Sequence, residues 1–305
     1  MTLDDIRMFV AACEAGTLSA VARRLGTTQP AVSQRVRRLE RECGLPLVER
    51  SRRGVAPTAA GRVLLDAAAE ALGALDAARR ELDRRRDGAG GSLRIATGGT
   101  TLRHFMTRPL AEFRRRHPAV TFDFVSATST RQCLDALRTS HADLAFVTIA
   151  GDDPLERRPT VRTPWVLVVA ADDPRAGGPP PSPAELAAIE PIGMLSHTTS
   201  RRQLESELAA HGVRIRFSAT VDEWDTAVQL VELGVGPSIV PAMWVHDLAD
   251  RPGLRALTIE GLRPLTFGWA ARRWEALPPY AASFVDLVGD ELARLAPAAQ
   301  VEMLA

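Results

Sequence analysis

The residues with the clearest chemical potential lie in one short stretch, TTQPAVSQRVRRLERECG, at residues 27–44. This stretch holds four arginines, although the whole chain of 305 residues has a net charge of only +1. At about 100° per residue, Val32, Val36 and Leu39 share one face of a helix and are expected to be buried. The opposite face then carries Pro30, Gln34, Arg37, Arg38 and Arg41. A helix with one apolar face and one cationic face is typical of a surface that binds a polyanion.

The first turn of this helix carries groups that can contact the edges of base pairs. A glutamine amide can pair with adenine through two hydrogen bonds, and a proline ring can contact a thymine methyl group. The first residues of a recognition helix are those that enter the major groove. We therefore expect Gln29, Pro30, Ser33 and Gln34 to lie within reach of base edges, and the Thr28 and Ser33 hydroxyls, Arg37 and Arg38 to be better placed for phosphate.

A second basic segment follows directly after this helix. In LPLVERSRRGVAPT, residues 45–58, two short β-like runs flank ERSRRG, and Gly54 suits a turn. This pattern predicts a small hairpin, or wing, that lies beside a DNA duplex. Arg50, Arg52 and Arg53 are expected to hold phosphates or to enter the minor groove.

Two further helices are expected to position the cationic one. A stripe of apolar residues predicts a helix over residues 3–15 that ends at Gly16. Ser19 can cap a second, short helix that ends at Gly26, and Thr28 can cap the third. Two helices, a tight turn and a third helix make a helix-turn-helix.

Charge is distributed unevenly along the chain. Residues 1–62 contain 11 arginines and 6 acidic residues, which gives +5, so the remainder of the chain carries −4. A basic N-terminal part on a mildly acidic body indicates that only the N-terminal part meets a polyanion.

A long helix is predicted over residues 59–87. Apolar residues repeat along it with alternating spacings of four and three, as in a coiled-coil heptad. The members of this seam are Leu64, Ala68, Ala71, Leu75, Ala78 and Leu82. The pattern favours a helix that pairs with a second copy of the chain, and the alternative is a long helix lying on its own domain.

Beyond a flexible hinge, DGAGGS at residues 87–92, strand-like and helix-like segments alternate. This alternation predicts an α/β architecture with largely parallel sheets. ATGGTT, residues 96–101, and SATSTR, residues 126–131, each lead from a strand end into a helix. Because ligands of open α/β sheets bind at this edge, we expect the two turns to contact a small molecule, a carboxylate or another anion.

Several kinds of chemistry have no signature in the sequence. Cys13, Cys43 and Cys133 are widely spaced and offer neither zinc ligands nor a disulfide framework. Nucleotide-binding glycine motifs and hydrolase motifs are missing, so we expect no cofactor, no metal and no enzymatic activity. No apolar run is long enough to span a bilayer, and the acidic N-terminus is unlike a secretion signal, so we expect a cytoplasmic protein without membrane contact.

These features together resemble one family. Residues 1–62, with LDDIRMFVAACEAGTLSAVARRLGTTQPAVSQRVRRLERECGLPLVERSRRGVAPTAAG, look like the N-terminal domain of LysR-type transcriptional regulators. LVELGVGPSIVP, residues 230–241, is similar to a glycine-containing turn in the second half of that family's effector domain.

The resemblance implies an overall α/β protein with three parts. These are a winged helix-turn-helix over residues 1–58, a dimerising linker helix over 59–87 and a two-lobed effector domain, like a type 2 periplasmic binding protein, over 88–305. Lobe I is expected at about 92–163 and 268–305, and lobe II at about 164–267, with crossing strands near 163–168 and 262–269.

The resemblance also implies partners and effector contacts. The expected partners are double-stranded promoter DNA, a small effector held between the lobes and further copies of the chain, as homodimers that usually form homotetramers. Thr100, Thr101, Thr128 and Ser129 would line one lobe of the cleft, and Ser196 and His197 the other.

Other functions remain open on the sequence alone. The chain could be a constitutive regulator whose effector cleft is vestigial, or an enzyme with an appended DNA-binding head. A solute-binding protein of the same lobed fold would need export, and no signal segment supports that alternative.

Overall fold

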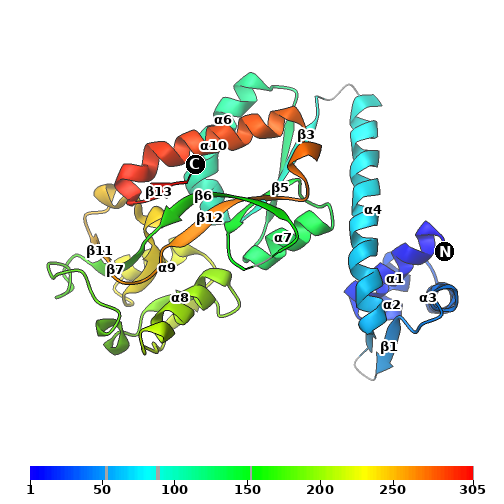
Figure 1. Cartoon of the computed structure of the whole chain (residues 1–305), viewed down its shortest axis with the longest axis horizontal. Helices are drawn as coiled ribbons and strands as arrows, with labels where there is room; N and C mark the ends of the chain where they lie inside the picture. Colours follow the sequence, from blue (N-terminus) through cyan, green and yellow to red (C-terminus); the bar gives the residue numbers. More distant parts are fainter. Residues whose placement is uncertain (52–53, 87–89, 152, 305) are drawn as a thin grey trace. The chain divides into compact units, whose positions relative to one another are not determined.

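The computed structural model describes residues 1–51, 54–86, 90–151 and 153–304 (Figure 1). The chain divides into two compact units, residues 1–87 with 138–141, and residues 88–137 with 142–305. Each unit is described by itself. None of the described helices combines the length and the apolar character needed to cross a bilayer.

The first unit begins with three short helices, which are α1 (Leu3–Ala15), α2 (Leu18–Arg24) and α3 (Gln29–Cys43). Gly16, in the left-handed region with φ +66°, ends α1, and Thr28 caps α3 by accepting a hydrogen bond from the Ala31 N–H, as predicted. The predicted cap of α2 is wrong. Thr17 rather than Ser19 accepts the N–H of Ala20, at 3.2 Å, because the chain turns into the helix directly after Gly16.

The core of this unit is formed by the apolar faces of the three helices. Val32, Val36 and Leu39 of α3 are fully buried, as the helical periodicity predicts, and pack with Phe9 and Val21. Burying such a side chain stabilises the fold by roughly 1.5–3 kcal/mol relative to leaving it in water. The core therefore fixes the rotation of α3 and leaves its other face outside.

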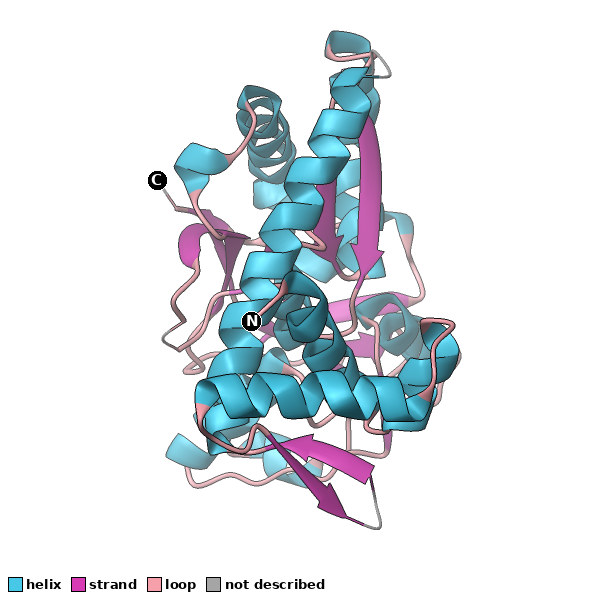
Figure 2. Cartoon of the chain, turned by 90° about the vertical axis from the view of Figure 1, so that its right-hand side faces the viewer, coloured by secondary structure: helices cyan, strands magenta, loops and turns pink. Residues whose placement is uncertain are grey.

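A hairpin and a long helix complete the unit. Strands β1 (Val48–Ser51) and β2 (Gly54–Pro57) pair antiparallel, and α4 (Ala59–Arg86) follows. In Figure 2 the hairpin extends below α3. The α4 backbone passes so close to the preceding loop that a Cβ at Gly61 would lie 1.9 Å from the Leu47 carbonyl oxygen, and only glycine fits there.

The second unit contains two mixed β-sheets. The six-stranded sheet has the order β13-β6-β12-β5-β3-β4 and the five-stranded sheet the order β11-β7-β10-β8-β9. The strands are β3 (Ser92–Thr97), β4 (Thr121–Ser126), β5 (Leu144–Thr148), β6 (Glu156–Thr163), β7 (Trp165–Ala170), β8 (Ile192–Met194), β9 (Ala219–Val221), β10 (Ser238–Pro241), β11 (Leu254–Thr258), β12 (Leu265–Ala271) and β13 (Glu302–Met303). β3, β4 and β5 pair in parallel, as do β10, β8 and β9, whereas β12 and β7 pair antiparallel with their neighbours.

Helices cover both sheets. The main ones are α6 (Thr107–Arg116), α7 (Thr130–Arg138), α8 (Thr199–Ala210), α9 (Trp224–Glu232) and α10 (Pro279–Ala299). A short helix α5 (Gly99–Thr101) runs through a π-helical turn, η1 (Leu102–Met106), into α6. Single 3-10 turns are η2 (Glu185–Ala188), η3 (Ala242–Val245), η4 (Leu248–Asp250) and η5 (Trp274–Ala276). Helices α6 and α10 lie side by side (Figure 1).

The two sheets mark two lobes, joined by two crossings of the chain. The chain leaves the six-stranded sheet at Thr163, enters the five-stranded sheet at Trp165, and returns between Thr258 and Leu265. Leu265 already pairs with Thr163 in the six-stranded sheet. Lobe I therefore resumes at Leu265, three residues before the expected boundary at 268, because the apolar stretch from Leu265 pairs along the whole of β6.

Candidate nucleic-acid interface and ligand cleft

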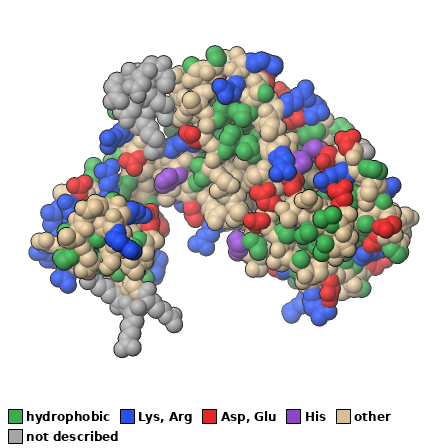
Figure 3. Space-filling view, turned by 180° about the vertical axis from the view of Figure 1, so that it is seen from behind, with side chains coloured by type: hydrophobic (Ala, Val, Ile, Leu, Met, Phe, Trp, Pro, Cys, Tyr) green, Lys and Arg blue, Asp and Glu red, His purple; other side chains and the backbone are tan. Residues whose placement is uncertain are grey.

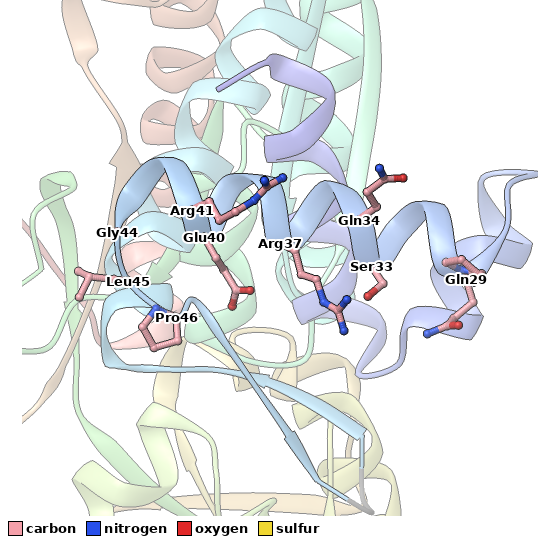
Figure 4. A pocket seen from close by; sticks show the side chains of 10 residues that line it. Gln29, Ser33, Gln34, Arg37, Glu40, Arg41, Gly44, Leu45 and Pro46 are labelled. Carbon is pink, nitrogen blue, oxygen red and sulfur yellow. The ribbon is translucent and has the colours of Figure 1, made fainter.

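The outer face of α3 forms one wall of a shallow groove closed by the loop that leads into the hairpin. Figure 4 shows Gln29, Ser33 and Arg37 following one another along the same side of the helix. The groove is lined by Gln29, Pro30, Ser33, Gln34, Arg37, Glu40, Arg41, Gly44, Leu45 and Pro46. Pro30, Gln34, Arg37 and Arg41 are exposed, so the two-faced helix expected from the sequence is present.

Two cations of this face, Arg37 and Arg41, are available to an external anion. Neither Arg37 nor Arg41 forms an ion pair with any residue that the structure describes. Arginine side chains also lie at the surface of this unit in the space-filling view (Figure 3). An exposed guanidinium without an internal partner gives up little when it binds a phosphate.

Arg38 has a different environment, although it is the next residue along α3. Its guanidinium donates to the fully buried carboxylate of Asp5 through Nη2 and, at 3.1 Å, through Nε. The Thr2 backbone N–H and hydroxyl also donate to Asp5. Burial raises the pKa of Asp5, but the hydrogen bonds from Arg38 and Thr2 outweigh that effect and hold the pKa at about 2. Arg38 therefore serves the fold by compensating a buried charge.

Glu40 has a role that the sequence did not indicate. Its carboxylate accepts the backbone N–H groups of Leu47 and Val48, at 2.9 and 3.2 Å, and so ties the start of the hairpin to α3. Thr58 adds a second tie, because its hydroxyl donates to the Pro46 carbonyl oxygen at 2.8 Å. The position of the hairpin beside α3 is thus set by side chains on both sides of it.

The other residues expected to contact DNA are Ser33, Thr28 and the arginines of the hairpin, and their environments differ. Ser33 is buried, with only 8% of its surface exposed, and it lies at the base of the groove. Thr28 uses its hydroxyl to cap α3. The side chain of Arg50 and all of Arg52 and Arg53 lie outside the described part of the structure.

The apolar seam of α4 is used in two ways. Leu64 and Ala68 pack into the core of the helix-turn-helix, as a helix lying on its own domain would do. The rest of the seam is exposed, with 46% of Leu75 and 67% of Leu82 accessible, along with Ala71 and Ala78. The exposed part of the seam forms an apolar stripe on the surface of α4, and exposed apolar patches commonly mark sites of protein–protein contact.

A small cavity of about 90 Å³ lies between the two lobes of the second unit. Thr100, Thr101, Thr128 and Ser129, expected there from the sequence, all line it. The expectation for the other lobe is wrong by a few residues. Ser196 and His197 are exposed, and the lining comes from Thr198, Thr199 and Ser200, because the chain reaches the cavity only where α8 begins.

Some of the cavity hydroxyls are already used within the fold. Ser129 accepts the N–H of Gln132, and Thr198 accepts the N–H of Arg201, so both cap helices. Others have no such role. Thr101, Thr148 and Ser200 are 6–7% exposed, and their hydroxyls form no hydrogen bond with the described residues. Buried hydroxyls of this kind need a ligand or water as partner.

Hydrogen bonds connect the two lobes beside the cavity. The Thr100 hydroxyl donates to Glu223 Oε2 at 3.0 Å, from lobe I to the residue that precedes α9 in lobe II. His104 Nε2 lies 2.7 Å from Asp225 Oδ1, and His104 Nδ1 lies 3.3 Å from His246 Nε2. Burial lowers the pKa of His246, and the nearby His104 lowers it further.

Comparison with known proteins assigns the family. The helix-turn-helix model described as "Bacterial regulatory helix-turn-helix protein, lysR family" matches residues 3–62, and the "LysR substrate binding domain" model matches residues 86–293. The chain belongs to the LysR family, which confirms the resemblance seen in the sequence. It is a DNA-binding transcriptional regulator of LysR type, with an effector-binding domain.

Individual relatives agree with this assignment. The chain is 31% identical over 287 residues to the HTH-type transcriptional regulator IlvR of Caulobacter vibrioides, covering 91% of this chain and 94% of IlvR. It is 28% identical to the RuBisCO operon transcriptional regulator of Allochromatium vinosum, over 97% and 98% of the two chains. These relatives are transcriptional regulators.

Solved structures share the fold. The chain superposes on the crystal structure of CbnR, a LysR family transcriptional regulator, with a TM-score of 0.61 and 23% sequence identity. The match covers 95% of this chain and 99% of the CbnR chain. The structure of a C206 mutant of Corynebacterium glutamicum OxyR matches 98% of this chain and 95% of its own length, with a TM-score of 0.60 and 24% identity.

Proposed function

We propose that this regulator binds promoter DNA by placing the outer face of α3 in the major groove. The observation that carries the proposal is the free cationic face itself, where Arg37 and Arg41 have no ion-pair partner in the described structure. Gln29 and Gln34 lie on the same groove and offer amides suited to base edges. Arg37 and Arg41 then hold phosphates on either side. CbnR, which shares the fold, has been solved in complex with its target DNA.

Footprinting on the upstream region of the protein's own gene tests this function. We expect protection of a discrete sequence, and we expect Gln29→Ala to change which sequences are preferred more than it changes affinity for random DNA. Equal weakening on all sequences would contradict a base contact by Gln29. Arg131→Ala, an exposed substitution in the effector domain, is the matched control and should leave the footprint unchanged.

The exposed stripe on α4 is proposed to pair with a second copy of the chain. Leu75 and Leu82 are large apolar side chains that remain exposed in the single chain, and pairing would remove them from water. Leu75→Arg should produce a monomer in sedimentation experiments, whereas Asp66→Arg, on another face of the helix, should not. A dimer that survives Leu75→Arg would contradict this interface. Assembly of two dimers into a tetramer is proposed from the family alone.

The cavity between the lobes is proposed to bind the effector that controls DNA binding. Residues from both sheets line it, so a bound molecule contacts both lobes at once and can change how they sit together. We propose a regulatory role in the cytoplasm, where bacterial promoters lie, and no catalytic role. A ligand recovered unchanged after incubation with the protein is the expected result.

A further inference from the structure

Three kinds of side chain in the walls of the interlobe cavity bear on the choice of ligand. Four aromatic rings contribute, from Phe146, Trp224, Trp244 and Phe267. Two carboxylates, the exposed Asp222 and the half-buried Glu223, lie side by side in sequence directly before α9. The remaining polar lining consists mostly of hydroxyls, and there is no arginine among the described residues that line the cavity.

This lining is poorly suited to the simple anion expected from the sequence. The place where an anion would meet the start of the α5 helix is taken by the protein's own carboxylate. Glu223 Oε2 accepts the Thr100 hydroxyl at 3.0 Å, and a Cβ on Gly99 would lie only 2.7 Å from Glu223 Oε1. An anionic ligand would be repelled by the carboxylates of Glu223 and Asp222. The described residues that line the cavity include no cation to compensate this repulsion.

The same lining matches an ammonium group. A cation is attracted both to carboxylates and to the faces of aromatic rings, and this combination recurs where proteins bind amines. The unpaired hydroxyls of Thr101, Thr148 and Ser200 remain for a second polar group, and a hydroxyl can donate to a carboxylate. The cavity thus offers a place for both ends of a zwitterion.

We propose that the effector is a small ammonium compound of the α-amino acid class, with its ammonium group against Glu223 and Asp222 and its carboxylate against the buried hydroxyls. This inference rests on the proposed function of the cavity as the effector site. The volume of about 90 Å³ limits the size of the ligand. A cavity of about 150 Å³ holds benzene, which has as many heavy atoms as alanine, so a ligand of that size requires the lobes to separate slightly when it binds.

Calorimetric titration of the full chain with three molecules of one carbon skeleton tests the proposal. L-Alanine carries both charged groups, L-lactate has a hydroxyl in place of the ammonium, and L-alaninol lacks the carboxylate. We expect L-alanine to bind at least about tenfold more tightly than L-lactate, since loss of a charge-paired group costs at least that much. We expect L-alaninol to bind more weakly than L-alanine, because it lacks the carboxylate that the buried hydroxyls receive. L-Alaninol binding as tightly as L-alanine would overturn the assignment to the α-amino acid class.

Two substitutions, one directly before α9 and one at its end, test whether the preference for L-alanine arises in the interlobe cavity. Glu223→Gln should lower the affinity for L-alanine at least about tenfold, while Glu232→Gln, on the same helix but outside the cavity, should leave it unchanged. If Glu223→Gln does not fold, the preference of the natural chain still decides the question. L-Lactate binding as tightly as L-alanine, no binding of any of the three at millimolar concentration, or an unaltered Glu223→Gln variant would each overturn the inference. If the ligand inference fails but the protein still protects its DNA site in footprinting without ligand, the proposed DNA-binding function is unaffected.

Discussion

The outer face of α3 and the interlobe cavity are both polar, but they handle their polar groups in opposite ways. On α3, the guanidiniums of Arg37 and Arg41 are exposed and have no internal partner in the described structure. In the cavity, the hydroxyls of Thr101, Thr148 and Ser200 have no partner among the described residues and belong to residues that are more than nine-tenths buried, and the acid Glu223 already accepts a hydrogen bond. A polyanion releases counterions when exposed cations neutralise it, whereas a small ligand gains most from a few polar groups kept away from water.

The same contrast appears between neighbours on one helix. Arg37 faces the groove, and Arg38 compensates the buried carboxylate of Asp5. Both are arginines, one residue apart, on the cationic side expected from the sequence. Arg37 is available to an external partner, whereas the guanidinium of Arg38, although exposed, is held by the buried Asp5 carboxylate. Separating these two roles by substitution is the sharpest way to test the account.

The largest effect is expected for Arg38→Ala. This change removes the guanidinium that donates to the buried Asp5 carboxylate and leaves only the more distant Arg35, at 3.7 Å, as a cationic neighbour, and a buried charge that loses its main partner destabilises a fold. We expect the equilibrium constant for unfolding of the N-terminal unit to rise about 10- to 100-fold in urea titrations. Arg37→Ala, the matched control, should leave stability within about 0.5 kcal/mol, as most surface substitutions do. Equal stability of the two variants would show that Arg38 is not a structural residue.

A pH dependence follows from the same carboxylate. The pKa of Asp5 is lowered from 3.8 to about 2, so its contribution to stability is present above pH 3.8 and is lost as the pH falls through about 2. The contribution amounts to roughly 2 kcal/mol. The stability difference between the natural chain and Asp5→Asn should therefore be constant near neutral pH and shrink below pH 4. A difference that does not change with pH would contradict the lowered pKa.

A smaller effect is expected at Glu40, the acid in the groove. Glu40→Gln keeps a carbonyl oxygen that can accept the Leu47 and Val48 N–H groups but removes a negative charge from the groove beside α3. We expect DNA affinity to rise roughly two- to fivefold in low salt, in line with one surface charge. Glu40→Ala, which removes the acceptor as well, should instead loosen the hairpin and weaken binding. Weaker binding by Glu40→Gln would mean that the charge itself is required.

Local sequence patterns predicted the parts of the fold that depend on near neighbours. The periodicity of Val32, Val36 and Leu39 placed the buried face of α3, and the capping residue Thr28 marked its start. The turns before α5 and α7 were predicted to line the cleft, and they do, because the carboxyl ends of β3 and β4, which pair in parallel, share one edge of their sheet.

Features that depend on distant partners could not be predicted. The partner of Arg38 is 33 positions away, and Glu40 binds a loop whose course the sequence does not reveal. The same holds for Glu223, which reaches Thr100 across 123 positions and gives the cavity an acid where an anion had been expected. The α4 seam was interpreted as one stripe, yet Leu64 and Ala68 are covered by the protein's own helices.

The central claim is that the free cations of α3 hold DNA phosphates, and the salt dependence of DNA binding tests it most directly. The affinity of the natural chain, Arg37→Ala and Arg131→Ala for one footprinted fragment should be measured over a range of salt concentrations. We expect Arg37→Ala to weaken binding and to reduce the slope of log affinity against log salt by about 1 for each phosphate that the variant no longer neutralises, with Arg131→Ala unchanged. An Arg37→Ala variant with the slope and affinity of the natural chain would contradict the docking of α3 on DNA.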